Sequence, residues 1–221
     1  MEPKINIMAI NGSPKAKNNT SILLNEAIKG AKDVGDVEIT QFNFAGKKIN
    51  PCKASCSKYC AKNADCCQKD DFQEFVKIRE ESDAVLFATP VYHMGLPSPV
   101  KAALDRLGQV HYRSCGGRFK RIYKVGGAIA HGGTHYGGQE IVLQQIINHF
   151  LMSTYIPVTG DRPESYLGVA GFSPNTETLQ NDKVVKQSAY SIGKRVAELT
   201  KIVKVGLAGL KDKLPQEYFN F

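Results

Sequence analysis

The chain has 221 residues, of which 42% are hydrophobic and 23% are charged. These values suit one large globular α/β domain better than two small ones, and a core of that size needs no disulfide or metal. No apolar run reaches the roughly eighteen residues that a membrane span requires, which excludes a transmembrane helix. The first residues read as a strand instead of a signal peptide, so we expect a cytoplasmic protein.

The formal net charge of +8 raises the question of an anionic partner. The lysines and arginines are scattered along the chain without a basic block, which favours an ordinary solvated surface. A positive field that steers anionic cofactors is the second interpretation. Nucleic-acid binding is the third, because no recognition module is visible. We therefore expect neither a nucleic acid nor a membrane as partner.

Short apolar runs bounded by turn residues predict buried strands, and apolar residues that recur with helical period predict helices. The predicted strands cover residues 4–10, 37–42, 84–89, 123–130 and 155–158. The predicted helices cover about 20–31, 70–81, 98–107, 139–150 and 182–203. Asn19 or Thr20 is placed to cap the first helix, and residues 161–181 are expected to form a loop. This alternation predicts a parallel sheet with helices on both faces.

Three loops of unusual composition follow the first, third and fourth predicted strands. They read NGSPKAKNNT at residues 11–20, TPVYHMG at 89–95 and HGGTHYGG at 131–138. Ligands bind outside the carboxyl ends of the strands in an open parallel sheet, so these loops are expected to share one site. Each loop alone is also compatible with an ordinary turn, and the combination at three strand ends is the stronger signal.

The first loop has the composition of a phosphate site. Its hydroxyls, side-chain amides and backbone N–H groups lie ahead of a helix, at the positive end of the helix dipole. The residues that offer them are Ser13, Asn18, Asn19, Thr20 and Ser21, and Lys15 and Lys17 add charge. A capped loop without a ligand would use the same residue types. The spacing matches neither a Walker A loop nor a G-x-G-x-x-G fingerprint.

On these residues the chain resembles the flavodoxin-like NAD(P)H-dependent FMN reductase superfamily, and within it the iron-sulfur flavoprotein family. The matching stretches are NGSPKAKNNT, PVYHMGLPSPVKAALDR, KVGGAIAHGG and GGQE, and with their spacing they cover roughly residues 4–160. The resemblance implies a flavodoxin-like, doubly wound, five-stranded parallel sheet in a single FMN-binding domain over residues 1–221. A cysteine-rich insertion at 50–68 and a C-terminal helical extension over about 182–221 would complete it.

By that resemblance the cofactor is FMN. Its phosphate would lie in the Ser13–Ser21 loop, its ring and ribityl chain along Pro90–Gly95, and the other side of the flavin against residues 131–133. The cofactor-binding residues implied are Ser13, Pro14, Lys15, Asn18, Asn19, Thr20, Ser21, Pro90, Val91, Tyr92, His93, Met94, Gly95, His131, Gly132 and Gly133. Another residue is more usual at position 131, so His131 either donates to the ring or faces solvent. Asp105 and Arg106 are expected to be structural, capping and pairing near the helix end.

Five of the six cysteines fall between residues 52 and 67. Such crowding in a reducing compartment points to metal or redox chemistry. Four of them, Cys52, Cys56, Cys60 and Cys66, follow C-x3-C-x3-C-x5-C, and four thiolates from one compact run favour a [4Fe–4S] cluster. The alternatives are zinc, a redox dithiol and inert buried thiols. The remaining cysteine, Cys115, is expected to be a plain thiol.

The iron-sulfur flavoproteins carry a motif nearer to C-x2-C-x2-C-x4–7-C just before a helix that begins with two aspartates. In this chain the first two gaps are each one residue longer. Either Cys66 or Cys67 could serve as the fourth ligand. Cys66 is preferred because three residues then separate it from Asp70 and Asp71, as is usual in the family.

These features predict an FMN-dependent electron-transfer flavoprotein that also carries a [4Fe–4S] cluster. A cluster-free NAD(P)H-dependent FMN or quinone reductase is the alternative, and a zinc-stabilised binding module is a remote one. The resemblance implies a homo-oligomer, either a dimer or a tetramer. The electron donor is expected to be a small carrier, a ferredoxin-type protein or NAD(P)H, and NAD(P)H rests on analogy alone because no nicotinamide fingerprint is visible.

Overall fold

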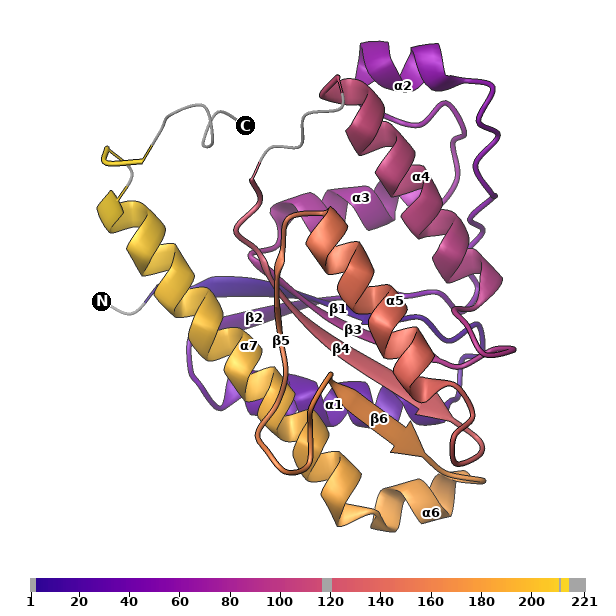
Figure 1. The fold of residues 1–221 in the computed structure, drawn as a ribbon, viewed down its shortest axis with the longest axis vertical. Coiled ribbons are helices and arrows are strands. Elements are labelled where there is room, and N and C mark those ends of the chain that lie inside the picture. Colours follow the sequence, from indigo (N-terminus) through magenta and orange to yellow (C-terminus); the bar gives the residue numbers. More distant parts are fainter. Residues whose placement is uncertain (1–2, 117–120, 211, 215–221) are drawn as a thin grey trace.

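The computed structural model describes residues 3–116, 121–210 and 212–214, and Figure 1 shows how strands and helices alternate along the chain. The strands in this part are β1 (Ile5–Asn11), β2 (Val37–Asn43), β3 (Ala84–Pro90), β4 (Val125–Gly132), β5 (Ile156–Val158) and β6 (Val169–Phe172). The helices are α1 (Asn19–Lys32), α2 (Ser57–Asn63), α3 (Phe72–Glu81), α4 (Ser98–Ser114), α5 (Gln139–Met152), α6 (Thr176–Asn181) and α7 (Lys183–Leu210).

All the paired strands run parallel, in the order β2–β1–β3–β4–β5. The chain leaves β1 toward β2 and then crosses back to β3 on the other side of β1. This is the doubly wound order of flavodoxin-like proteins, and it confirms the predicted fold class. The loops after β1 and β3 leave the sheet in opposite directions, which opens a crevice at the carboxyl ends of these strands.

The position beside β4 is shared by two short strands. The first half of β4 pairs with β5, from Val125 opposite Ile156, and the second half pairs with β6, from Ile129 opposite Val169. The predicted loop over residues 161–181 is therefore wrong in part, because β6 and α6 lie within it. A four-residue strand flanked by Gly, Ser and Pro is too short to show a period of its own.

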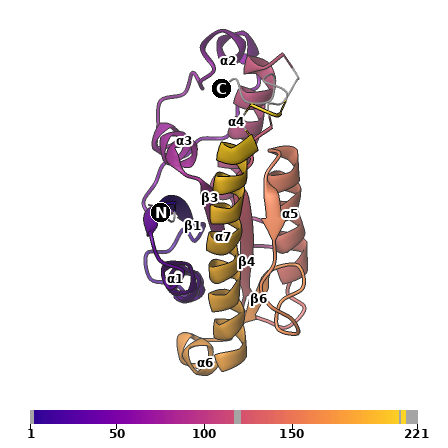
Figure 2. The same cartoon turned by 90° about the vertical axis from the view of Figure 1, so that its left-hand side faces the viewer.

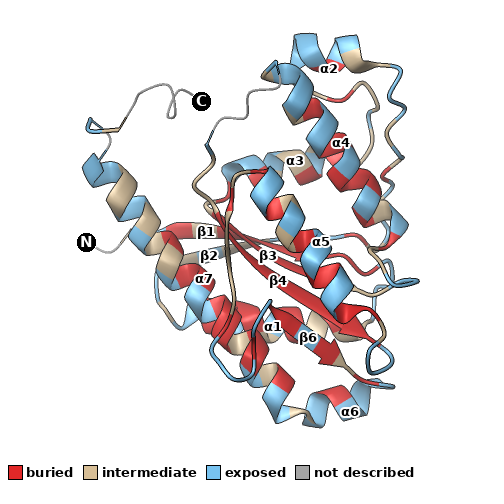
Figure 3. Cartoon of the chain, viewed as in Figure 1, coloured by how far each residue is buried: buried red, intermediate tan, exposed pale blue. Residues whose placement is uncertain are grey.

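Two apolar clusters, one on each face of the sheet, form the core. On one face α1 and α7 pack on β1, β3 and β4, and Leu23, Ile28 and Ile192 belong to this cluster. On the other face α3, α4 and α5 bury Phe75 and Phe150 together with residues of all four long strands. In Figure 3 both β3 and β4 are drawn as buried along their lengths. This explains why their sequences are continuous apolar runs.

The contact between α1 and α7 is unusually close. A Cβ added at Gly30 would lie 2.0 Å from the Tyr190 carbonyl oxygen, and one at Gly193 would lie 1.8 Å from that of Ala27. The two helices therefore touch backbone to backbone, which only glycine permits at these two positions. Figure 2 shows α7 in front of the sheet with α1 beside it. This packing fixes the C-terminal half of α1 against α7.

Several predicted boundaries need correction. The cysteine segment, for which no helix was predicted, contains α2, and the helix predicted to end near residue 107 continues to Ser114. Consequently Asp105 and Arg106 lie in mid-helix, so the predicted capping role is wrong. The cap of α1 is Asn18, not Asn19 or Thr20: the Asn18 Oδ1 accepts from the Ser21 amide at 2.8 Å. Within the described residues, no helix is long and apolar enough to cross a membrane.

Candidate functional site

A pocket of about 710 Å³ opens at the carboxyl ends of β1, β3 and β4. It is lined by residues of all three loops singled out in the sequence. They are Ser13, Lys15, Asn18, Asn19, Thr20, Ser21, Pro90, Val91, Tyr92, His131 and Gly133. The doubly wound topology brings these loops together, because parallel strands end at one edge of the sheet.

The loop after β1 is folded on itself. The Ser13 hydroxyl accepts from the Lys15 amide at 3.2 Å, and the Asn18 side-chain amide donates to the Lys15 carbonyl at 2.7 Å. These bonds fix the turn before α1 starts. The first amides of a helix have no acceptor within the helix, so an anion in the adjoining pocket can accept from them. The lysines at 15 and 17 line the same pocket and are exposed.

The loop after β3 makes a tight turn. Tyr92 and Gly95 exchange two backbone hydrogen bonds of 2.9 Å each. Between them His93 and Met94 both have positive φ values, of 46° and 61°. Two left-handed residues in succession are strained for side chains other than Gly, Asn or Asp, and such strain is concentrated at functional sites. The turn presents exposed Tyr92 and Met94 side chains beside the pocket mouth.

The end of β4 is joined to the β6–α6 segment and to α1. His131, which is 7% exposed, lies 2.9 Å through Nε2 from the Ser173 hydroxyl. Ser173 also accepts from the Asn19 side chain at 3.1 Å, and Thr176 donates to Asn19 at 2.7 Å. Burial lowers the pKa of His131, so the ring is neutral at physiological pH. The neutral ring bonds to a hydroxyl inside the protein instead of facing solvent.

Not every predicted residue lines the pocket. Pro14, His93, Met94, Gly95 and Gly132 lie on the same loops but do not line it. A Cβ at Gly132 would lie 2.5 Å from the Gln139 side chain, so this glycine admits α5 close to the strand. The pocket is also lined by residues that the sequence did not indicate as site residues: Ala16, Ile22, Thr176 and Gln180. The last two come from α6, whose position depends on pairing across the sheet.

The residues present fit the chemistry of FMN. Serine, asparagine, lysine and a helix start lie at one end of the pocket, which suits a phosphate. Pro90 and Val91 form an apolar wall farther along, which suits a flat ring. At Gly133 an added Cβ would meet no atom within 4 Å, so the backbone there leaves open space.

The cysteine segment places four other thiols near Cys60: Cys52, Cys56, Cys66 and Cys67. Cys60 is 4% exposed, and burial raises the pKa of its thiol, with further contributions from Cys66, Cys67 and Cys52 nearby. Cys56 interacts with Cys60 and with Cys67, and its contact with Cys67 raises the pKa of that thiol. All six cysteines are free thiols, and Cys115 lies apart at the end of α4.

Arg106 of α4 fastens both ends of this segment. Its side chain is 0% exposed, and its Nη1 lies 2.8 and 2.7 Å from the two carboxylate oxygens of Asp70. The same guanidinium donates to the Asn50 carbonyl at 3.2 Å and to the Gln68 carbonyl at 2.9 Å. The Cys66 thiol lies beside it, where its field helps to raise the pKa of Arg106 against the effect of burial. The Nε of Arg106 is buried without a partner among the described residues.

The donor chemistry of the segment fits an iron–sulfur cluster. In the part of the chain that the structure describes, no three His, Cys, Asp or Glu side chains converge as ligands of a single ion do. A cubane cluster differs, because each of its four cysteines binds a separate iron. Neighbouring thiols that do not converge on a single ion are therefore compatible with a cubane cluster.

Comparison with known proteins identifies relatives over most of the chain. An iron-sulfur flavoprotein of Methanocaldococcus jannaschii is 33% identical over 198 residues, which is 90% of this chain and 98% of that protein. An iron-sulfur flavoprotein of Archaeoglobus fulgidus is 36% identical over 197 residues, or 87% of this chain and 96% of that one.

Solved structures share the fold at low identity. A flavone reductase aligns with a TM-score of 0.66 at 19% identity, over 90% of this chain and 64% of that chain. An NAD(P)H:quinone oxidoreductase from Methanothermobacter marburgensis aligns with a TM-score of 0.62 at 12% identity, over 88% and 98% of the two chains. The sequence profile described as NADPH-dependent FMN reductase matches residues 5–160. The chain therefore belongs to the family of NADPH-dependent FMN reductases, and it is an oxidoreductase.

Proposed function

We propose that this protein is an FMN-dependent electron-transfer flavoprotein that also carries a [4Fe–4S] cluster. The observation that supports FMN most directly is the pocket shared by the three loops, with its helix start, polar loop and apolar wall. The relatives named iron-sulfur flavoprotein, together with the five adjacent thiols, support the cluster.

In this proposal the chain's own residues bind and orient the flavin. The backbone and hydroxyls from Ser13 to Ser21 hold the phosphate, while Lys15 and Lys17 neutralise its charge. Pro90–Gly95 packs along the ring, and residues 131–133 close the opposite side. His131 stays neutral and holds Ser173, which keeps α6 against the pocket. When bound, FMN supplies two-electron acceptance and one-electron release.

The thiolates of Cys52, Cys56, Cys60 and Cys66 are proposed as the cluster ligands. None of these cysteines lines the FMN pocket, and Figure 1 shows α2 beside the far end of α4, away from the carboxyl ends of the strands. Electron exchange between the two groups is thus more direct across an interface than within one chain. We therefore propose a homo-oligomer, a dimer or tetramer, that receives electrons from a small carrier, a ferredoxin-type protein or NAD(P)H.

The test is anaerobic purification followed by iron, sulfide, zinc and FMN assays and a visible spectrum. Flavin bands over a brown shoulder with about four irons per chain are expected. The Cys56→Ser/Cys60→Ser double variant is expected to keep FMN and lose iron, and its turnover with a one-electron acceptor should fall. Cys115→Ser is the matched control, because Cys115 lies outside the thiol group. Unchanged turnover in the double variant would contradict the relay.

A second candidate is an NAD(P)H-dependent FMN or quinone reductase without a cluster. The match to the NADPH-dependent FMN reductase profile and the fold shared with a quinone oxidoreductase favour it. It predicts a yellow protein without iron that oxidises NAD(P)H directly. The iron assay and an NAD(P)H oxidation assay on one sample distinguish the two candidates.

A further inference from the structure

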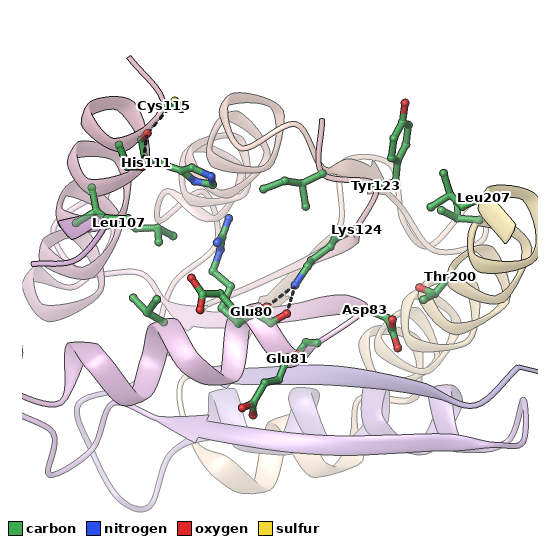
Figure 4. Close-up of a pocket in the computed structure, with 18 of the residues that line it drawn as sticks. Glu80, Glu81, Asp83, Leu107, His111, Cys115, Tyr123, Lys124, Thr200 and Leu207 are labelled. Atoms are coloured by element: carbon green, nitrogen blue, oxygen red, sulfur yellow. Dashed lines mark hydrogen bonds between the residues drawn. The ribbon is translucent and has the colours of Figure 1, made fainter. Parts of the chain in front are cut away.

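A second and larger cavity, of about 840 Å³, lies at the opposite end of the sheet from the FMN pocket. It is bounded by the ends of α3 and α4, the residues that lead into β4, and the last turns of α7. Figure 4 shows Leu107 and His111 of α4 facing Thr200 and Leu207 of α7 across it. Its apolar walls are Val76, Leu107, Val110, Ile122, Val203 and Leu207.

Arg79 lines this cavity and carries an uncompensated charge. Its side chain is 6% exposed, and its Nε and Nη2 have no hydrogen-bond partner among the described residues. The guanidinium carbon lies 5.3 Å from the centroid of the Tyr155 ring, whose hydroxyl is also buried without a partner in that part of the chain. A buried charge that lacks a counterion is strongly destabilising. The described residues therefore leave this cation incompletely stabilised.

The surroundings do not neutralise Arg79. Burial, and then the Arg79 charge, lower the pKa of Lys124 to about 8. Burial, Arg79 and His111 together lower the pKa of His149 to about 3. The positive charge of Arg79 therefore disfavours the protonated forms of both Lys124 and His149.

Two of the three carboxylates that line the cavity have other partners, and the third, Glu80, is exposed. Asp83 accepts from Lys204 at 2.9 Å, and Glu81 lies 4.0 Å from Lys77. Lys124 donates to the backbone carbonyls of Arg79 and Glu80, at 2.5 and 3.0 Å, so its ammonium closes the end of α3. Figure 4 shows both bonds beside the cavity. Among the described ion pairs, none includes Arg79.

We propose that this cavity binds an amphipathic organic carboxylate. The ligand's apolar body packs against the walls contributed by α4 and α7, and its carboxylate pairs with Arg79. Arg79 lies in the wall of the cavity, and the ligand's carboxylate supplies the counterion that the described ion pairs do not give it. No residue that lines this cavity also lines the candidate FMN pocket.

Calorimetric titration of the purified holoprotein with decanoate, and separately with 1-decanol, tests the site. Decanoate is expected to bind to the wild type, and Arg79→Met should weaken it at least about tenfold, as for the loss of a charge-assisted hydrogen-bond pair. The affinity for 1-decanol should not change. Arg195→Met, an exposed change on α7 outside the cavity, is the control and should bind both probes normally.

Two results would overturn the proposal: no binding of decanoate to the wild type, or equal affinity in Arg79→Met. Leu207→Trp provides a second test if Arg79→Met does not fold, because it fills the cavity from the half-buried side of α7. This variant should bind both decanoate and 1-decanol more weakly than the wild type. Thermal unfolding checks that the variant is folded. Unchanged decanoate affinity in Leu207→Trp would likewise place the ligand elsewhere.

Discussion

Two buried arginines of this protein have opposite surroundings. Arg106 gives its Nη groups to the carboxylate of Asp70 and to two backbone carbonyls, so its charge and nearly all its donors are matched. Arg79 lies over an aromatic ring and keeps two donors unmatched. The surroundings of Arg106 are those of a structural ion pair. Those of Arg79 are those of a residue that binds a ligand.

Loss of the buried Arg106–Asp70 ion pair should lower the free energy of unfolding far more than loss of an exposed ion pair. Arg106→Leu leaves the Asp70 carboxylate, 3% exposed, without its counterion. We expect a loss of about 3–5 kcal/mol in the free energy of unfolding, measured by urea denaturation. Lys101→Met breaks the exposed pair with Asp105 on the same helix and should cost under about 1 kcal/mol. Similar losses in both variants would show that the buried ion pair is not stabilising.

Stability should also depend on the ionisation of Asp70. Burial by itself raises the pKa of this carboxyl, but the bonds from Arg106 and from the amides of Asn50 and Phe72 outweigh it, and the net pKa is lowered. The stabilisation is therefore complete above the unfolded pKa of about 3.9 and is lost as pH falls through the lower folded pKa. In urea unfolding, Asp70→Asn should have a lower free energy of unfolding than the wild type at pH 6. The difference between the two free energies should be smaller at pH 3. A constant difference would contradict this linkage.

At the scale of elements, periodicity located every long strand and helix, because each buries one face or both in the core. It failed for α2, β6 and α6, because elements of seven, four and six residues are too short to show a period. Periodicity also placed the end of α4 too early, since the residues after Leu107 are mostly polar. These turns of α4 project beyond the sheet, where a polar face is stable.

The candidate FMN pocket was foreseeable where residues belong to one loop, and not where distant segments meet. NGSPKAKNNT and PVYHMG carry local signals of a loop before a helix and of a tight turn. Thr176 and Gln180 reach the pocket only because β6 pairs with β4. The unmatched Nε and Nη2 of Arg79 likewise follow from packing, since in sequence this residue is an ordinary helical arginine.

The α1–α7 contact should be intolerant of a single methyl group. In Gly193→Ala the new Cβ would meet the Ala27 carbonyl at 1.8 Å, so the helices must separate. A loss of about 1–3 kcal/mol is expected from urea denaturation. Gly206→Ala on the same helix meets no atom within 4 Å and should instead stabilise by up to about 1 kcal/mol. Equal effects of the two changes would show that the close approach is not maintained in solution.

At the scale of the molecule, the sheet separates two regions. The candidate FMN pocket lies at the carboxyl ends of the strands, whereas α2 and the second cavity lie toward the other end of α4. The rigid parallel sheet between them holds both regions at fixed positions. No cysteine of the segment lines the candidate FMN pocket, so the proposed relay requires contact between subunits.

Subunit mixing can test this arrangement. The Cys56→Ser/Cys60→Ser variant should lack the cluster but keep FMN, and Lys15→Glu/Lys17→Glu, which puts carboxylates where the phosphate is proposed to bind, should lack FMN but keep iron. Each variant alone should be inactive in transfer from a one-electron donor to a two-electron acceptor. After subunit exchange, a mixture should regain activity if electrons cross between chains, because some interfaces then join an intact cluster to an intact flavin. Transfer confined to one chain would leave the mixture as inactive as its components, while cluster and FMN content stay unchanged.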